Sequence, residues 1–172
     1  SSFNQDIGGW AVHSVRNMES MFYDASGFDQ DIGDWAVGSV TDMTYMFSEA
    51  SAFNQDIGDW ALDSVMDMRG MFYRASAFNQ DLGEWAVHGI TTVKGMQQMF
   101  YGASAFDQDL GWCVDDEVSI YTAFVNTKCA STSCGVMWET NAGDCDMSRT
   151  GNVMVNWKIR WAVTAWLADA TA

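Results

Sequence analysis

The sequence predicts an α/β solenoid, a right-handed coil in which each repeat holds a short parallel strand and a short helix. The first observation is a 25-residue repeat: the hexapeptide Phe-Asn-Gln-Asp-Ile-Gly at residues 3–8 returns, with small changes, at 28–33, 53–58 and 78–83, and once more at 106–111. The second is a tryptophan after each copy, at Trp10, Trp35, Trp60, Trp85 and Trp112. The third is a methionine-rich stretch ending in Met-Phe that follows the first four tryptophans. Self-similarity at such a period is typical of solenoids, in which each repeat buries its apolar face against its neighbours.

The copy at residues 53–77 shows how one repeat is expected to fold. Its first six residues predict a turn, because Asn54 and Asp56 can hydrogen-bond their own backbone and Gly58 can adopt a positive φ. The next segment, residues 60–68, suits a short strand in a parallel stack together with its flanking turn. Its apolar side chains are Trp60, Leu62, Val65 and Met68.

Residues 68–75 predict a helix of about two turns, because apolar side chains recur at the i, i+3, i+4 and i+7 spacing of one helix face. The methionines at matched positions of the four regular repeats are predicted to fill the core rather than to serve metal or redox chemistry. They are Met18, Met21, Met43, Met46, Met68, Met71, Met96 and Met99.

The repeats divide the chain into three parts. Residues 1–112 form a repeat solenoid of four and a half repeats, residues 113–151 a degenerate repeat with a disulfide-stapled, Cys-rich C-terminal cap, and residues 152–172 a Trp-rich terminal helix. Between residues 93 and 100 the chain is three residues longer than its counterparts, so we expect the helix of that repeat to be extended or bulged. We also expect a mature or trimmed piece of a longer protein, with a further region after the terminal helix.

The terminal helix is expected to pack on the cap or on a following domain. One side would carry Ile159, Val163, Trp166 and Leu167, with Trp157 and Trp161 beside it. Lys158 and Arg160 near its middle, and its short length, argue against a membrane span. The alternative is a docking helix, in which Trp157, Trp161 and Trp166 bind a partner or a membrane interface.

The four cysteines, Cys113, Cys129, Cys134 and Cys145, predict two disulfides rather than a metal site, because they form no Cys-x2-Cys pair and no histidine is near. Three pairings are possible. We favour Cys113–Cys129 with Cys134–Cys145, because sequence neighbours close loops at the lowest entropic cost. Disulfides place the chain outside the cell, on its surface or in another oxidising lumen.

The charge of the chain restricts the classes of partner that it is expected to bind. The formal net charge is −15, from 23 acidic and 8 basic residues. Such a balance disfavours nucleic acids, whose phosphates require a cationic face, and adsorption to anionic lipid. A solvated acidic surface, a basic partner or cations remain open.

The repeat reads Met-Phe-x-x-Ala-x-x-Phe-Asn-Gln-Asp-Ile-x-x-Trp-x-Val-x-Ser-Val-x-x-Met and closely resembles the BspA-like surface-protein repeat, also known as the 25-residue mycoplasma lipoprotein-type repeat. That family is a divergent branch of the leucine-rich repeats, and the resemblance covers residues 1 to about 125. It implies a leucine-rich-repeat-like coil in a non-enzymatic binding, adhesion or scaffolding module, usually exported, without cofactors. The Cys-Val-Asp-Asp segment at 113–116 and the Trp-rich helix resemble the algal versions.

No catalytic constellation is expected. His13 and His88 share one repeat position, where other copies have Gly38 and Asp63, which indicates an exposed and tolerant position. The sequence holds no Ser/His/Asp order, phosphate loop or His-Glu-x-x-His motif. We therefore predict that the chain is not an enzyme.

One aspartate recurs in every repeat and is predicted to form a column, one coil spacing apart. Like charges so close repel, unless each carboxylate caps a backbone turn or a cation lies between them. We favour turn capping, and calcium bridging is the alternative. The residues are Asp6, Asp31, Asp56, Asp81 and Asp109.

Two classes of function stay open. The first is a protein-interaction or adhesion module that binds its partner through the residues that vary between repeats: Arg16, Thr41, Met66 and Thr91 in one column and Glu19, Thr44, Arg69 and Lys94 in another. The second is a structural accessory subunit, docked through the Trp-rich helix on the lumenal or extracellular face of a larger membrane complex.

Overall fold

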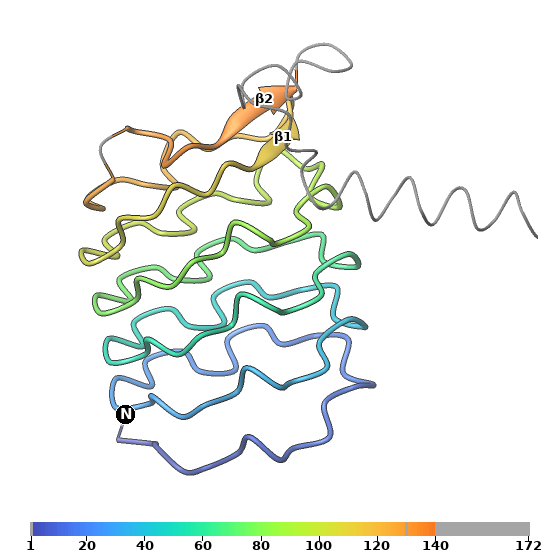
Figure 1. The fold of residues 1–172 in the computed structure, drawn as a ribbon, viewed down its shortest axis with the longest axis vertical. Coiled ribbons are helices and arrows are strands. Elements are labelled where there is room, and N and C mark those ends of the chain that lie inside the picture. The colour runs from blue at the N-terminus through green and yellow to red at the C-terminus, as the bar shows by residue number, and fades with distance from the viewer. Residues whose placement is uncertain (1, 130, 140–172) are drawn as a thin grey trace, which may run out of the picture.

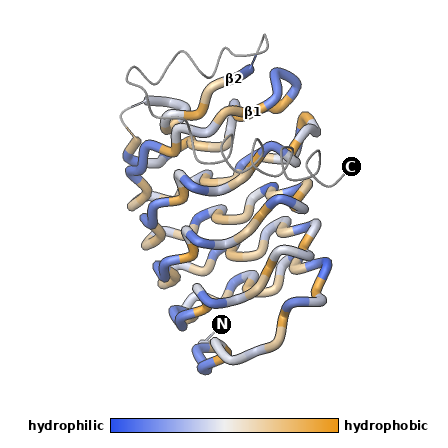
Figure 2. The backbone as a smooth tube through the Cα atoms, turned by 45° about the vertical axis from the view of Figure 1, so that its right-hand side comes forward, coloured by the Kyte–Doolittle hydropathy of each residue, from blue (hydrophilic) through white to orange (hydrophobic). Residues whose placement is uncertain are grey.

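The computed structural model describes residues 2–129 and 131–139, which form a stack of coils along the long axis, with the N-terminus at one end (Figure 1). Two strands are regular: β1 (Cys113–Asp115) and β2 (Met137–Glu139), which pair in parallel with Cys113 opposite Met137. Hydrophobic and hydrophilic stretches of successive coils lie above one another (Figure 2). The predicted terminal helix, residues 152–172, lies outside the described residues.

Residues 68–75 form consecutive turns instead of the expected helix. The N–H groups of Met68, Gly70, Phe72 and Arg74 donate to carbonyls of the next coil at 2.7–2.9 Å. Between them, the N–H groups of Met71 and Tyr73 donate three residues back, and that of Arg69 donates to Oδ1 of Asp67 at 3.0 Å. An α-helix needs every amide for bonds within itself, so a segment that gives every second amide to a neighbouring coil cannot be one.

We call this segment and its counterparts the turn series. They comprise residues 18–24, 43–49, 68–74, 96–102 and 120–126. The chain reverses twice in each of the first four, at residues with positive φ such as Gly70 (56°) and Arg74 (55°). The strand expected over residues 60–68 is reduced to single parallel bridges, from Asn17 to Asp42 and from Asp42 to Asp67. The coils are therefore joined mainly by the alternate amides of the turn series.

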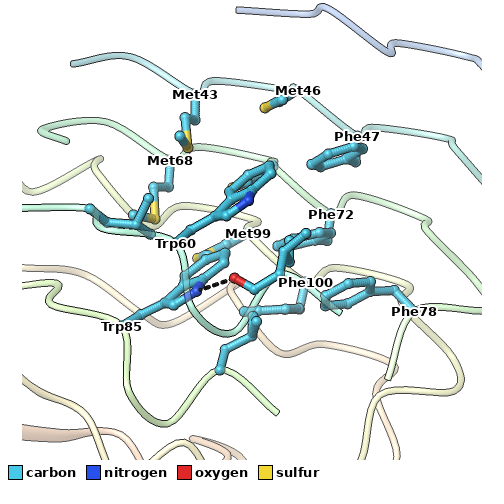
Figure 3. Close-up of a cluster of buried hydrophobic side chains, with 14 of the residues drawn as sticks. Met43, Met46, Phe47, Trp60, Met68, Phe72, Phe78, Trp85, Met99 and Phe100 are labelled. Carbon is cyan, nitrogen blue, oxygen red and sulfur yellow. Dashed lines mark hydrogen bonds between the residues drawn. The ribbon is translucent and has the colours of Figure 1, made fainter. Parts of the chain in front are cut away.

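The core consists of side chains stacked on their counterparts in the next coil. Figure 3 shows Phe47, Phe72 and Phe100 in one column, with ring centroids 5.6 and 5.2 Å apart. A second phenylalanine column packs beside it, and Phe72 and Phe78 approach to 4.0 Å. Of the eight methionines predicted in the core, all are buried except Met21 of the first coil, which is 38% exposed.

Each junction between coils also carries polar bonds. The indole Nε1–H of Trp85 donates to the carbonyl of Ile57 in the preceding coil at 3.0 Å (Figure 3). Equivalent bonds run from Trp35 to Ile7, from Trp60 to Ile32 and from Trp112 to Leu82. The side-chain oxygen of Asn54 accepts from the backbone N–H of Asn79 at 2.9 Å. The prediction that Asn54 bonds its own turn was therefore wrong, because this side chain reaches the next coil.

The three extra residues of the fourth repeat form one more turn. Gly95 N donates to Thr92 O and Gln97 N to Lys94 O. The insertion shifts the register, because Gly70 N donates to Gln97 O in the same way that Tyr45 N donates to Arg69 O. Gln97 therefore follows Arg69 in its column, where the sequence had predicted Lys94.

The favoured disulfide pairing was wrong. Cys129 pairs with Cys134, with Cα atoms 5.3 Å apart. Cys113 is also disulfide-bonded, and Cys145 lies outside the described residues. The same loop-closure argument favours the pair separated by only five residues, which the prediction had passed over. Cys134 is buried in the core beyond Leu110, whose N–H donates to its carbonyl at 2.9 Å.

Replacing Cys129 and Cys134 by serine is expected to cost about 2 kcal/mol of local stability, since the bond closes a short loop. Hydrogen exchange of the Leu110 amide measures the effect, because this amide bonds the Cys134 carbonyl. Exchange should accelerate at Leu110 and stay unchanged at Phe47 in the middle of the stack. Equal rates in variant and wild type at Leu110 would show that the disulfide does not hold this end together.

Candidate functional site

Four of the five recurring aspartates cap turns, as favoured from the sequence, and for Asp109 the capping role stays a prediction. Oδ1 of Asp6, Asp31, Asp56 and Asp81 accepts from the N–H of the glycine two residues later at 2.9–3.0 Å. All four side chains are exposed. Further exposed carboxylates follow three of the four caps, at Asp34, Asp59 and Glu84, so this edge of the stack, which we call the acidic edge, carries mainly negative charge.

The acidic edge does not gather ligands for a metal ion in the described residues, where no three His, Cys, Asp or Glu side chains lie close enough to hold one. A carboxylate that already accepts a backbone N–H has one partner without any cation. Calcium bridging stays a prediction from the sequence.

Asp56→Asn and Asp56→Ala separate capping from calcium bridging. The asparagine retains the acceptor for Gly58 N, so its free energy of unfolding should stay within about 0.5 kcal/mol of wild type. The alanine loses the bond and should cost about 1 kcal/mol. Thermal unfolding with calcium and with a chelator is the measurement. A calcium-dependent rise in Tm in wild type that Asp56→Asn abolishes would show that the cation, and not the cap, explains this column.

A different face carries the tyrosines. All five tyrosines of the chain fall in the turn series, one in each coil: Tyr23, Tyr45, Tyr73, Tyr101 and Tyr121. We call the outer side of the five turn series the tyrosine face. Tyr23 is 54% exposed and Tyr121 89%, and the other three are partly exposed. Tyr23, Tyr73 and Tyr101 share one repeat position, which Ser48 occupies in the second coil.

The middle of the tyrosine face is ordered by ring and charge contacts. Tyr73 and Tyr101 stack with centroids 5.3 Å apart. The Arg74 guanidinium lies 5.1 Å from the Tyr73 ring centre, which is within cation–π range, and 3.9 Å from a carboxylate oxygen of Glu49. Beside them, a hydrogen bond to Asp67 and its charge raise the pKa of Arg69 above its usual value.

Cations gather on this side of the molecule. All five lysines and arginines of the described residues lie in a turn series or within two residues of one. They are Arg16, Arg69, Arg74, Lys94 and Lys128. Aromatic side chains, arginine and methionine are the residue types enriched in protein interfaces. Met66 and Val93, which precede the third and fourth turn series by two and three residues, are also exposed.

The residues predicted to bind a partner lie in this region but are not equally accessible. Arg16, Glu19, Met66, Thr91 and Lys94 are exposed, and Thr41 and Arg69 are partly buried. Thr44 is only 2% exposed, so its inclusion was wrong. Its hydroxyl finds no hydrogen-bond partner in the described structure. The remaining candidates, Trp157, Trp161 and Trp166, lie outside the described residues.

The sequence prediction missed the tyrosines themselves. It compared positions that vary between repeats, but the five tyrosines occupy three different repeat positions. The signal was the occurrence of one tyrosine in each turn series. His13 and His88, which were expected to be exposed, are exposed.

A family profile described as "Mycoplasma protein of unknown function, DUF285" matches residues 1–112 and, in a second alignment, residues 37–138. The chain belongs to this family. The two matches together include all five turn series, so the tyrosine face lies within the part of the chain that DUF285 describes. No curated protein and no solved structure matches the chain. The described residues contain no helix that is long and apolar enough to cross a membrane.

Proposed function

We propose that the chain is a non-enzymatic protein-interaction module and that its partner binds the tyrosine face. Membership of a surface-repeat family supports a module of this kind. The stack offers a rigid support, since each turn series is held to the next by backbone bonds and by buried phenylalanine columns. A binding surface on such a support loses little conformational entropy when a partner docks.

One observation carries the proposal: the five tyrosines lie in the turn series, and the five lysines and arginines of the described residues lie in these segments or within two residues of them. Tyrosine supplies a large contact area at low entropic cost and a hydroxyl for polar contacts, which is why it dominates many binding surfaces. The turn series and the two residues on either side of each hold five acidic and five basic residues, whereas the whole chain has a net charge of −15. An acidic or neutral protein therefore meets less repulsion there than on the rest of the molecule.

The test compares two variants of the full chain as baits for surface or secreted proteins of the source cell. The first changes Tyr23, Tyr73 and Tyr101 to serine, the residue that the second coil already has at this position. The control changes Asp34, Asp59 and Glu84 on the acidic edge to the matching amides. We expect wild type and the control to capture the same partner in equal amounts. The tyrosine variant should capture at least tenfold less of it. Loss of the partner by the acidic-edge control alone would show that the partner does not bind the tyrosine face.

Three finer features belong to this proposal. The 25-residue hydrogen-bond period supports a leucine-rich-repeat-type solenoid, with turn series in the place of helices. The Cys129–Cys134 disulfide supports an oxidising location such as the cell surface. The Cys-Val-Asp-Asp segment supports the algal branch of the repeat family.

A further inference from the structure

The last turn series leaves two backbone donors open. In the earlier coils, two N–H groups near the end of each turn series donate to the next coil, as Phe100 does to Ala123 and Gly102 to Val125 at 2.7 and 2.8 Å. The equivalent groups of the last coil are the amides of Phe124 and Asn126. Neither donates to a backbone or side-chain acceptor in the described structure. Asn126 keeps the positive φ, 62°, that Arg74 and Gly102 have at this position.

A groove lies beside these two amides. It encloses about 610 Å³ and is lined by Ile120, Tyr121, Phe124, Val125 and Trp138, together with hydroxyl-bearing residues around 131–133. Among the lining residues none is charged, in contrast to the acidic remainder of the molecule. The Trp138 indole is fixed in the wall, because its Nε1–H donates to Val118 O at 2.9 Å. Open donors in an uncharged, partly aromatic groove suit an extended polypeptide rather than an ion.

The groove stands where a further turn series would lie. Residue 124 is the last phenylalanine of the column that runs through Phe72 and Phe100, and Phe100 and Phe124 stack at 5.5 Å. The register of β1 with β2 spaces equivalent residues by 24. At that spacing the sequence has Ser148 in the place of the next phenylalanine. A serine carries no ring that could extend the phenyl column.

We propose that this groove binds an extended, uncharged segment of a partner protein that carries a phenylalanine. The segment adds to the last coil as each turn series adds to the one before. Two of its carbonyls accept from the amides of Phe124 and Asn126, and its phenyl ring continues the column on Phe124. Backbone bonds supply affinity and the ring supplies specificity, as in other cases of strand addition.

The probe is a synthetic peptide with the sequence of residues 95–105, capped at both ends, which is uncharged and holds the equivalent phenylalanine, Phe100. Its control carries Phe100→Ser. Both are titrated into the isotope-labelled full chain, and the amides of Phe124 and Asn126 and the indole of Trp138 are followed by NMR. We expect saturable shifts and slowed amide exchange with the first peptide, and at least tenfold weaker binding of the control. A Val125→Asp chain, changed at a 38% exposed wall residue, should lose binding and keep its fold.

Three results would overturn the proposal. Equal binding of both peptides would remove the aromatic requirement. The absence of shifts at millimolar peptide would show that the groove takes no such segment. Slow exchange of the Phe124 and Asn126 amides in the chain alone, together with no peptide binding, would show that residues 140–172 fill the groove themselves. The tyrosine variant of the previous section leaves the groove intact, so the two proposals fail separately.

Discussion

Phe72→Ala is expected to lower the free energy of unfolding by about 3–5 kcal/mol, which would make it one of the most damaging substitutions in the chain. Phe72 is fully buried and stacks on Phe47 and Phe100 along its column and on Phe78 beside it. Removing the ring opens a cavity between coils whose backbones are fixed to each other by hydrogen bonds, so the gap cannot close by collapse. Urea unfolding followed by tryptophan fluorescence measures the loss.

Phe3→Ala is the matched control for Phe72→Ala. Phe3 belongs to the second column in the first coil, stacks on Phe28 at 5.7 Å and is 38% exposed. Phe3→Ala should lower the free energy of unfolding by less than half as much as Phe72→Ala, because folding buries only part of the Phe3 ring. Similar losses for the two substitutions would contradict the view that the columns hold the stack together through its middle.

Gly70→Ala is expected to destabilise the chain by about 2 kcal/mol or more. Gly70 has φ of 56°, but Tyr45 and Gln98 adopt the same region at this repeat position, so the backbone alone does not require glycine. The requirement comes from Tyr45, whose ring atoms Cε1 and Cδ1 would overlap a Cβ on residue 70. Thermal unfolding of the variant measures the cost.

The companion variant Tyr45→Ser tests this cause. Serine occurs at this position in the first coil as Ser20, so Tyr45→Ser alone should change stability little. Combined with Gly70→Ala, it should recover most of the loss and give a coupling energy of about 1–2 kcal/mol. Additive effects of the two substitutions would show that the backbone conformation, rather than the ring, selects glycine.

The spacing of apolar residues predicted which side chains are buried, but it predicted a helix where the chain forms turns. Met68, Met71, Phe72 and Ala75 point inward as expected, because a run of three-residue turns places the same i, i+3, i+4 and i+7 positions on one side as a helix does. The two structures differ in where alternate backbone N–H groups donate. In this chain the acceptor lies in the neighbouring coil, 23 to 27 residues away. A single repeat read by itself does not contain that information.

The site could be predicted only in part. The roles of Asp6, Asp31, Asp56 and Asp81 as turn caps follow from local chemistry and were predicted correctly. The burial of Thr44 and the shift of Lys94 out of its column depend on packing and on how an insertion is absorbed, so residue spacing gave the wrong answer for both. The tyrosine face could not be predicted by comparing equivalent positions, because the five tyrosines occupy three different positions of the repeat.

The most direct test of the tyrosine face is hydrogen–deuterium exchange of the full chain with and without its captured partner. Binding at that face should slow exchange in segments 18–24, 68–74 and 96–102 and leave the acidic edge at 29–35 and 54–60 unchanged. Protection of the acidic edge, with the turn series unaffected, would contradict the account and move the binding surface to the other side of the stack.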